Sequence, residues 1–134
     1  MTALLIRAAL EGRLAAMSPS LATAYENVPF KPTNGTAYQA VYVLFAQPDN
    51  REIGRQYVAR GFMQVSLFYP EGAGSAPAAT RAELIRTTFP RGLSLTNGGV
   101  IVTIDRTPEI LPGRNEDDRF VLPVRIPFYA PVSS

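Results

Sequence analysis

The side chains most capable of chemistry in this sequence form a short acidic run, Glu116-Asp117-Asp118. Three adjacent carboxylates could bind a hard cation, or supply the acid and the base of a hydrolase. Their spacing lacks the alternating ligands of a calcium-binding loop. Two other interpretations involve no catalysis: a solvated hairpin tip, or an intermolecular contact with arginines such as Arg51 and Arg55. We treat these five residues as candidate interface residues, and we predict no catalytic, cofactor-binding or metal-binding residue.

Other reactive groups are scarce. The chain has no histidine and no cysteine, which excludes Ser-His and Cys-His catalytic pairs, thiolate metal sites and disulfides. The sequence Gly72-Ala73-Gly74 precedes a helical pattern but lacks the remaining glycine of a dinucleotide-binding fingerprint, so it indicates a strand-to-helix reversal. We therefore predict a protein that is not an enzyme, has no cofactor and acts through its shape and surfaces.

Length and composition predict one domain over residues 1–134. The charged share is 18%, below the roughly 25% typical of soluble domains. Either part of the surface is covered in an oligomer, or the surface is polar but uncharged. The net charge of +2 is not a nucleic-acid signature by itself, and Lys31 is the only lysine beside the arginines. Arginine enrichment favours interface pairing with carboxylates, although a GC-rich genome would produce the same bias.

The six tyrosines could form a stacking platform for single-stranded nucleic acid. Such a platform needs interleaved basic residues, and few arginines lie near the tyrosines, so packing in the core or an interface is favoured. The apolar N-terminal stretch is interrupted by charges, which is not typical of a signal peptide, and no segment is long enough to span a membrane. We expect a protein that stays in the cytoplasm in which it is made.

The sequence predicts two amphipathic helices that position the side chains named above. The first is expected over 3–17, with Ile6, Leu10 and Leu14 in its apolar stripe. The second follows Ser75, which is expected to cap it. Its apolar positions are Ala78, Ala82, Ile85 and Phe89, and its expected solvent-facing positions are Arg81, Glu83 and Arg86.

Alternating apolar residues predict strands over 38–47, 57–69, 93–96, 99–105, 107–111 and 119–129. The strand over 38–47 is apolar on both faces, so we expect it to be covered twice, by its own fold or by a neighbouring subunit. Pro123 and Pro127 share parity on the last strand, and their missing N–H groups face one side, which predicts a sheet edge there. The fold class is α+β: a single antiparallel (mixed) β-sheet packed by two α-helices.

The order of several short motifs resembles the tail terminator (tail completion) proteins of long-tailed bacteriophages, in a branch known mainly as a phage-related domain. The motifs are YENVPF at 25–30, an apolar strand from Tyr38, GFMQV at 61–65, YPEGAG at 69–74 and VRIPFY at 124–129. The resemblance covers about 6–129, and each motif is short and structural.

The resemblance implies a tail-terminator-like α+β fold and a structural virion protein at the head-proximal end of the tail, assembled in the host cytoplasm. Such proteins form a homo-oligomeric ring, typically a hexamer, that caps the tail tube, stops its polymerisation and joins the head–tail connector. Partners would be further copies of the chain, the tail tube protein and connector proteins, with no membrane.

DNA would pass through the ring without specific binding. Because each neutralised phosphate adds affinity, we expect loops that face the lumen to be neutral or acidic, and the 116–118 run is a candidate. Two alternatives stand. One is another phage protein of similar fold, such as a head-completion or minor tail component; the other is a small ligand-binding or hydrolase domain that uses the 116–118 loop.

Overall fold

The computed structural model describes residues 2–33, 35–47, 57–72 and 74–132. The candidate interface residues Arg51 and Arg55, and Ala73 of the glycine-rich loop, lie outside the described residues. The elements, in order, are α1 (Thr2–Ala15), β1 (Ala22–Tyr25), β2 (Tyr38–Phe45), β3 (Tyr57–Pro70), α2 (Ala76–Thr88), β4 (Ser94–Asn97), β5 (Val100–Ile104), β6 (Glu109–Ile110), β7 (Arg114–Glu116) and β8 (Arg119–Val132).

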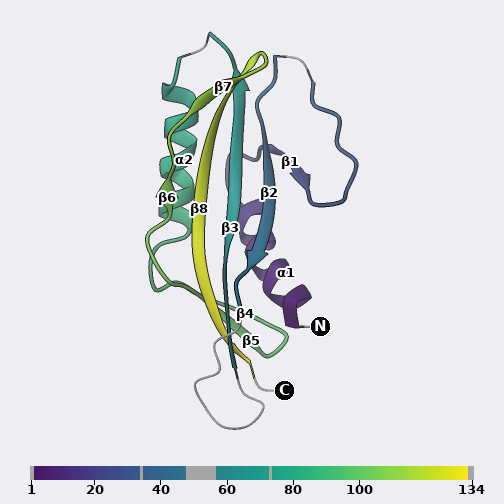
Figure 1. Cartoon of the computed structure of the whole chain (residues 1–134), viewed down its shortest axis with the longest axis vertical. Helices are drawn as coiled ribbons and strands as arrows, with labels where there is room; N and C mark the ends of the chain where they lie inside the picture. The colour runs from purple at the N-terminus through teal and green to yellow at the C-terminus, as the bar shows by residue number, and fades with distance from the viewer. Residues whose placement is uncertain (1, 34, 48–56, 73, 133–134) are drawn as a thin grey trace.

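Three long strands form the centre of the fold. β3 pairs antiparallel with β2 on one side and with β8 on the other, and the β3–β8 ladder runs from Tyr57↔Val132 to Pro70↔Arg119. In Figure 1 these strands run side by side along the long axis of the molecule, and β2 passes in front of α1. The alternation predicted for β3 and β8 is confirmed, because Met63, Val65 and Val124 are completely buried.

Both helices pack on the same face of this sheet. The core cluster contains Ile6, Leu10 and Leu14 from α1 together with the apolar stripe of α2. From the long strands the main core cluster takes one parity only, namely Val41, Val43, Ala59, Met63, Val65, Leu67, Leu122, Val124, Ile126, Phe128, Ala130 and Val132. Side chains of the other parity therefore lie on a sheet face that neither helix covers. Val121, which has the other parity, is also completely buried.

Two details of α2 differ from the sequence-based prediction. Ser75 occupies the N-cap position, but its side chain makes no capping hydrogen bond. The predicted solvent-facing position of Arg81 is wrong, because this residue is buried, with 5% of its surface exposed. Position 81 lies beside the apolar stripe of α2, three residues after Ala78 and four before Ile85, and the Pro19 carbonyl in the connection between α1 and β1 accepts a hydrogen bond from Arg81 Nη1.

The α+β class is confirmed, but the sheet is larger and more curled than the single helix-packed layer that the sequence predicts. Among the described residues the sheet has eight strands in the order β1-β2-β3-β8-β5-β4, with β6 and β7 also paired to β8. The sequence-based prediction lacks β1 and β7. The sheet is mixed because β1 pairs with β2 in parallel, whereas the other pairs are antiparallel.

The prediction that the last strand lies at a sheet edge is wrong. β8 is central, with β3 on one side and β5, β6 and β7 in succession on the other. The parity argument itself holds, since the carbonyls of Pro123 and Pro127 accept hydrogen bonds from Leu111 and Asp105 on the side away from β3. Three short strands, rather than one continuous strand, cover the side on which the prolines cannot donate.

Candidate interaction surfaces

The sheet face that the helices leave uncovered is rich in aromatic and arginine side chains. Cross-strand pairing fixes its composition: Tyr42, Gln64 and Arg125 form one row across the sheet, and Leu44, Phe62 and Pro127 form the next. We call this surface the arginine–aromatic face. It consists of Tyr38, Tyr42, Leu44, Arg60, Phe62, Gln64, Phe68, Arg119, Arg125, Pro127 and Tyr129.

Three arginines on this face lie over aromatic rings. The guanidinium carbon of Arg125 is 4.4 Å from the centroid of Phe62, that of Arg119 is 5.0 Å from Tyr38, and that of Arg60 is 5.7 Å from Tyr129. These distances are in the range of cation–π attraction. The strands β2, β3 and β8 contain no Asp or Glu, so the charge on the face is carried by arginine alone.

The three arginines differ in the hydrogen bonds and ion pairs that they form with the rest of the chain. Arg119 donates to the carbonyls of Thr33 and Thr36, and so holds the loop before β2 against the end of the sheet. Arg60 lies 3.8 Å from the carboxylate of Asp105.

Arg125 is less satisfied than either. Its Nη2 donates to the Gln64 side chain at 3.2 Å, its Nε is buried without a partner, and no carboxylate pairs with it among the described residues. Arg125 is therefore a cation with hydrogen-bonding capacity left over.

The acidic run lies in a tight turn between β7 and β8. Glu116 pairs with Arg119 in the strand register, so Asp117 and Asp118 are the two turn residues, and Asp117 takes a positive φ of 55°. All three acidic side chains are exposed, which confirms the interpretation as a hairpin tip.

The turn does not gather its carboxylates around a common point. The Glu116 carboxylate pairs with Arg114 at 2.9 Å. Within the described residues, no group of three or more Asp, Glu, His or Cys side chains is arranged to hold a metal ion.

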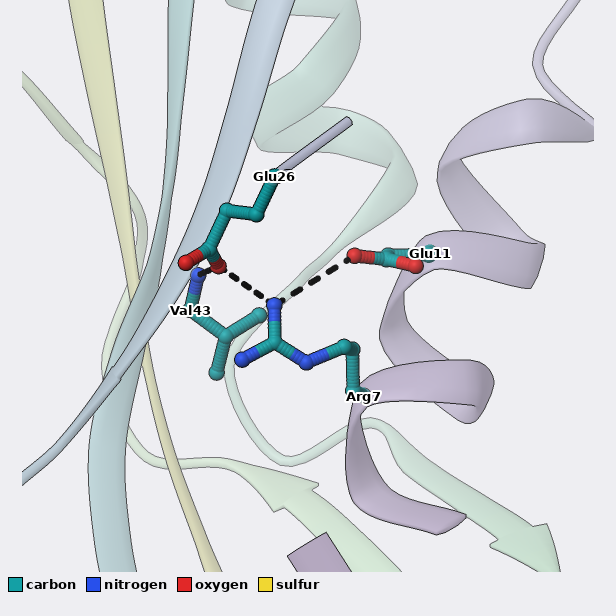
Figure 2. Close-up of polar contacts among 4 residues, drawn as sticks. All are labelled: Arg7, Glu11, Glu26 and Val43. Atoms are coloured by element: carbon teal, nitrogen blue, oxygen red, sulfur yellow. Dashed lines mark hydrogen bonds and ion pairs between the residues drawn. The ribbon is translucent and has the colours of Figure 1, made fainter. Parts of the chain in front are cut away.

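A second polar cluster lies in an open cleft of about 670 Å³ between α1 and the segment after β1. Figure 2 shows the Arg7 guanidinium between the carboxylates of Glu11 and Glu26. Glu26 Oε1 also accepts a hydrogen bond from the backbone N–H of Val43 at 2.8 Å. Because β1 ends at Tyr25, opposite Val41, the Glu26 side chain satisfies a β2 donor just beyond the parallel ladder.

The pKa values of the two glutamates in this cluster are shifted in opposite directions. Burial tends to raise the pKa of Glu26, but the hydrogen bonds from Arg7 and Val43 outweigh it, and the pKa of Glu26 is lowered below 4.5. Burial raises the pKa of Glu11 above 4.5 despite the nearby Arg7, and the charge on Glu26 adds to this rise. The arrangement positions α1 against β2.

A buried cation completes the set of unusual polar groups. The Nε and Nη2 atoms of Arg81 are buried and have no hydrogen-bond partner. Burial lowers the pKa of Arg81, and the neighbouring Tyr69 opposes that change. Burial also raises the pKa of the Tyr69 phenol. We assign these groups to the packing of α2 against the end of β3.

Sequence reasoning identified the acidic turn but missed the arginine–aromatic face. The signal was present, because the other parity of β2, β3 and β8 carries aromatic and arginine residues and no acid. Of the tyrosines, Tyr38, Tyr42 and Tyr129 share this face, whereas Tyr25, Tyr57 and Tyr69 pack against the core. In the part of the chain that the structure describes, no helix is long and apolar enough to cross a membrane.

Within the described residues, the polar groups lie on exposed surfaces or between packed elements. Comparison with known proteins places this fold in a family. A family model described as phage tail terminator protein matches residues 5–128, so the chain belongs to the phage tail terminator family. It is a structural protein of bacteriophage tails, which confirms the family resemblance drawn from the motif order.

Two solved structures resemble this one over nearly their whole length. One, whose name carries no functional description, is 30% identical, with a TM-score of 0.78 over 100% of this chain and 98% of that chain. The other is part of the virion of a native gene transfer agent particle; it is 18% identical, with a TM-score of 0.72 over 98% of both chains, and shares the fold. No curated protein matches the chain.

Proposed function

We propose that this protein is a non-enzymatic tail terminator that forms a homo-oligomeric ring, with six copies as the expected number, on the head-proximal end of the tail tube. The ring stops tube polymerisation and provides the surface that connector proteins of the head bind. DNA passes through its centre without specific binding, so the lumen is neutral or acidic. The protein is assembled in the host cytoplasm and remains in the virion.

Family membership supplies the setting, and the arginine–aromatic face is the observation that carries the proposal of assembly. Leu44 is 48% exposed on a sheet face that also holds Tyr42 and Phe62. An uncovered face with apolar residues and one sign of charge is typical of a surface that another protein covers. The prediction that the strand over 38–47 is covered twice therefore becomes part of this proposal, with a neighbouring subunit as the second cover.

The test is electron microscopy of particles made with and without the gene for this protein. We expect tails of irregular, excessive length and unjoined heads when the gene is deleted, with restoration when the wild-type chain is supplied from a plasmid. Tails of normal length that merely fail to join heads would assign the protein to head completion or a minor tail role. Normal virions from the deletion would contradict the proposal altogether.

A further inference from the structure

We propose that the acidic turn between β7 and β8 of one copy binds the arginine–aromatic face of the next copy, with the Arg125 guanidinium as its anchor. This inference rests on the proposed ring and specifies the contact that closes it. Its occupant is a second copy of this chain, chosen because the two surfaces are complementary in charge and lie on the same polypeptide.

The first argument is the unsatisfied state of Arg125. Its guanidinium lies on the Phe62 ring, donates to one neutral acceptor on Gln64, and pairs with no described carboxylate. The Nη1 atom makes no hydrogen bond within the described part of the chain. An arginine stacked on a ring and partly desolvated by it is a favourable site for a carboxylate, because charge-assisted hydrogen bonds are stronger there than in water.

The second argument is the state of the turn. Asp117 and Asp118 are exposed and form no ion pair among the described residues, whereas Glu116 already pairs with Arg114. The turn is a two-residue hairpin connection at the end of the sheet, so it presents both carboxylates on a rigid support. Among the described residues, the turn therefore has carboxylates without a cationic partner, and the face has a guanidinium without a carboxylate partner.

The third argument is distance within one copy. Arg125 lies seven residues along β8 from Asp118, which at a strand rise of ~3.3 Å per residue separates them by about 23 Å. The turn cannot reach Arg125 of its own chain, so the pairing must be between copies. A contact between two different surfaces of identical subunits is heterologous, and such contacts close into rings when the rotation allows.

The experiment uses charge reversal on both sides of the contact. Arg125→Glu changes the face, and the double change Asp117→Arg with Asp118→Arg changes the turn. We expect each variant to fold, as shown by an unchanged circular dichroism spectrum. We expect the assembled fraction of each variant to be at least tenfold lower than that of the wild type. Assembly is measured by light scattering and by co-sedimentation with purified tail tubes.

Mixing the two variants gives the decisive readout. In an alternating ring with an even number of copies, the face that carries Arg125→Glu meets the arginine turn, and the wild-type face meets the acidic turn. Every contact is then complementary again. We expect a 1:1 mixture to recover assembly that neither variant shows alone. The triple variant that carries all three changes should also recover it.

Two controls separate this contact from general effects. Arg91→Glu reverses the same charge at an exposed position that is not part of the face, and it should assemble as the wild type does. Arg125→Gln keeps a polar side chain without charge and should weaken assembly less than Arg125→Glu does.

Normal assembly of both charge-reversal variants, or a mixture as inactive as its components, would overturn the contact while leaving the tail-terminator function intact. A turn variant that assembles normally but impairs DNA passage would also overturn the contact, and it would place the turn in the lumen. Binding of a single-stranded oligonucleotide that is lost in Arg125→Glu, with assembly unaffected, would assign the face to nucleic acid instead. Failure of the wild-type chain to affect tails would refute the proposed function itself.

Discussion

At the scale of single residues, polar side chains connect elements that the sequence separates. Glu26 joins α1 to β2 through Arg7 and the Val43 amide, and Arg119 fastens the loop before β2 to the end of β8. Arg13 Nε donates to the Thr88 carbonyl at 2.7 Å and ties α1 to α2. These bonds matter because the charged side chains replace strand or helix partners that the backbone lacks at these positions.

Replacement of Glu26 by Gln should reveal the ion pair as a pH-dependent contribution to stability. The amide oxygen can still accept from Val43, so the change removes mainly the charge interaction with Arg7. The folded pKa of Glu26 is below 4.5, so its stabilisation is present above about pH 4.5 and is lost as the pH falls through the folded value. Since the side chain is 41% exposed, we expect only about 0.5 kcal/mol at pH 7.

The measurement is chemical unfolding of wild type and Glu26→Gln between pH 3 and pH 7. Glu11 is present in both proteins, and its raised pKa gives the opposite trend, since its protonation on acidification favours the folded state. The difference between the two proteins thus reports Glu26 together with its effect on the pKa of Glu11. A difference that stays constant across this pH range would contradict the assignment.

At the scale of elements, β8 organises the molecule. It offers a continuous ladder to β3, and on its other side it receives β5, β6 and β7. Pro123 and Pro127 interrupt donation on that other side, so one long partner strand would leave acceptors unsatisfied. Short partner segments accommodate the prolines because each can use a β8 carbonyl, as Leu111 does at 2.9 Å with Pro123.

Pro123→Ala should create a backbone N–H that points at the carbonyl of Leu111, since the β6 register continues from Ile110↔Val124 to this pair. We expect that amide to be protected from hydrogen exchange, and the free energy of unfolding to change by less than about 1 kcal/mol, because a hydrogen bond replaces lost ring packing. Pro131→Ala is the matched control. Its strand pairing is with Val58 of β3 only, so its new amide should exchange rapidly. Rapid exchange at position 123 would contradict the described pairing.

At the scale of the whole molecule, the described residues form a core on one face of the long strands, and neither helix covers the other face. Both helices are placed on the core side. The acidic turn borders one end of the arginine–aromatic face, beside Tyr38, Phe68 and Arg119, whereas Arg125 lies seven residues along β8 from Asp118. A subunit with two complementary surfaces at different places is suited to head-to-tail association. This geometry, rather than any reactive group, links the structure to a role in the phage tail.

Neighbouring positions on β2 should separate folding from assembly. Leu44→Glu alters the uncovered face at a 48% exposed position, so we expect little change in melting temperature but loss of assembly on tail tubes. Val43→Ala alters the core face at a 4% exposed position, and it should cost about 2 kcal/mol of stability while keeping assembly at low temperature. An unfolded Leu44→Glu protein, or one that assembles normally, would contradict the role of this face.

The local parts of this fold follow from the sequence. The period-2 pattern in 57–69 and 119–129 predicts two long strands, and the helical stripe from Ile6 to Leu14 and from Ala78 to Phe89 predicts the buried faces of both helices. Such patterns succeed because side-chain alternation depends only on the conformation of the segment itself. The absence of histidine and cysteine also follows from the sequence alone, and it excludes Ser-His and Cys-His catalytic pairs and thiolate metal sites.

Only the tertiary structure decided which partners these segments meet. Pro123 and Pro127 fix the side on which β8 cannot donate, but not that three short strands would fill it. The charge of Arg81 predicts a solvent-facing position, but the residue lies beside the apolar stripe, three positions after Ala78 and four before Ile85, and it donates to the Pro19 carbonyl of a loop distant in sequence. The arginine–aromatic face arises because pairing across β2, β3 and β8 brings separate residues into one surface. Long-range pairing depends on the whole chain folding around its core, so a local pattern cannot specify it.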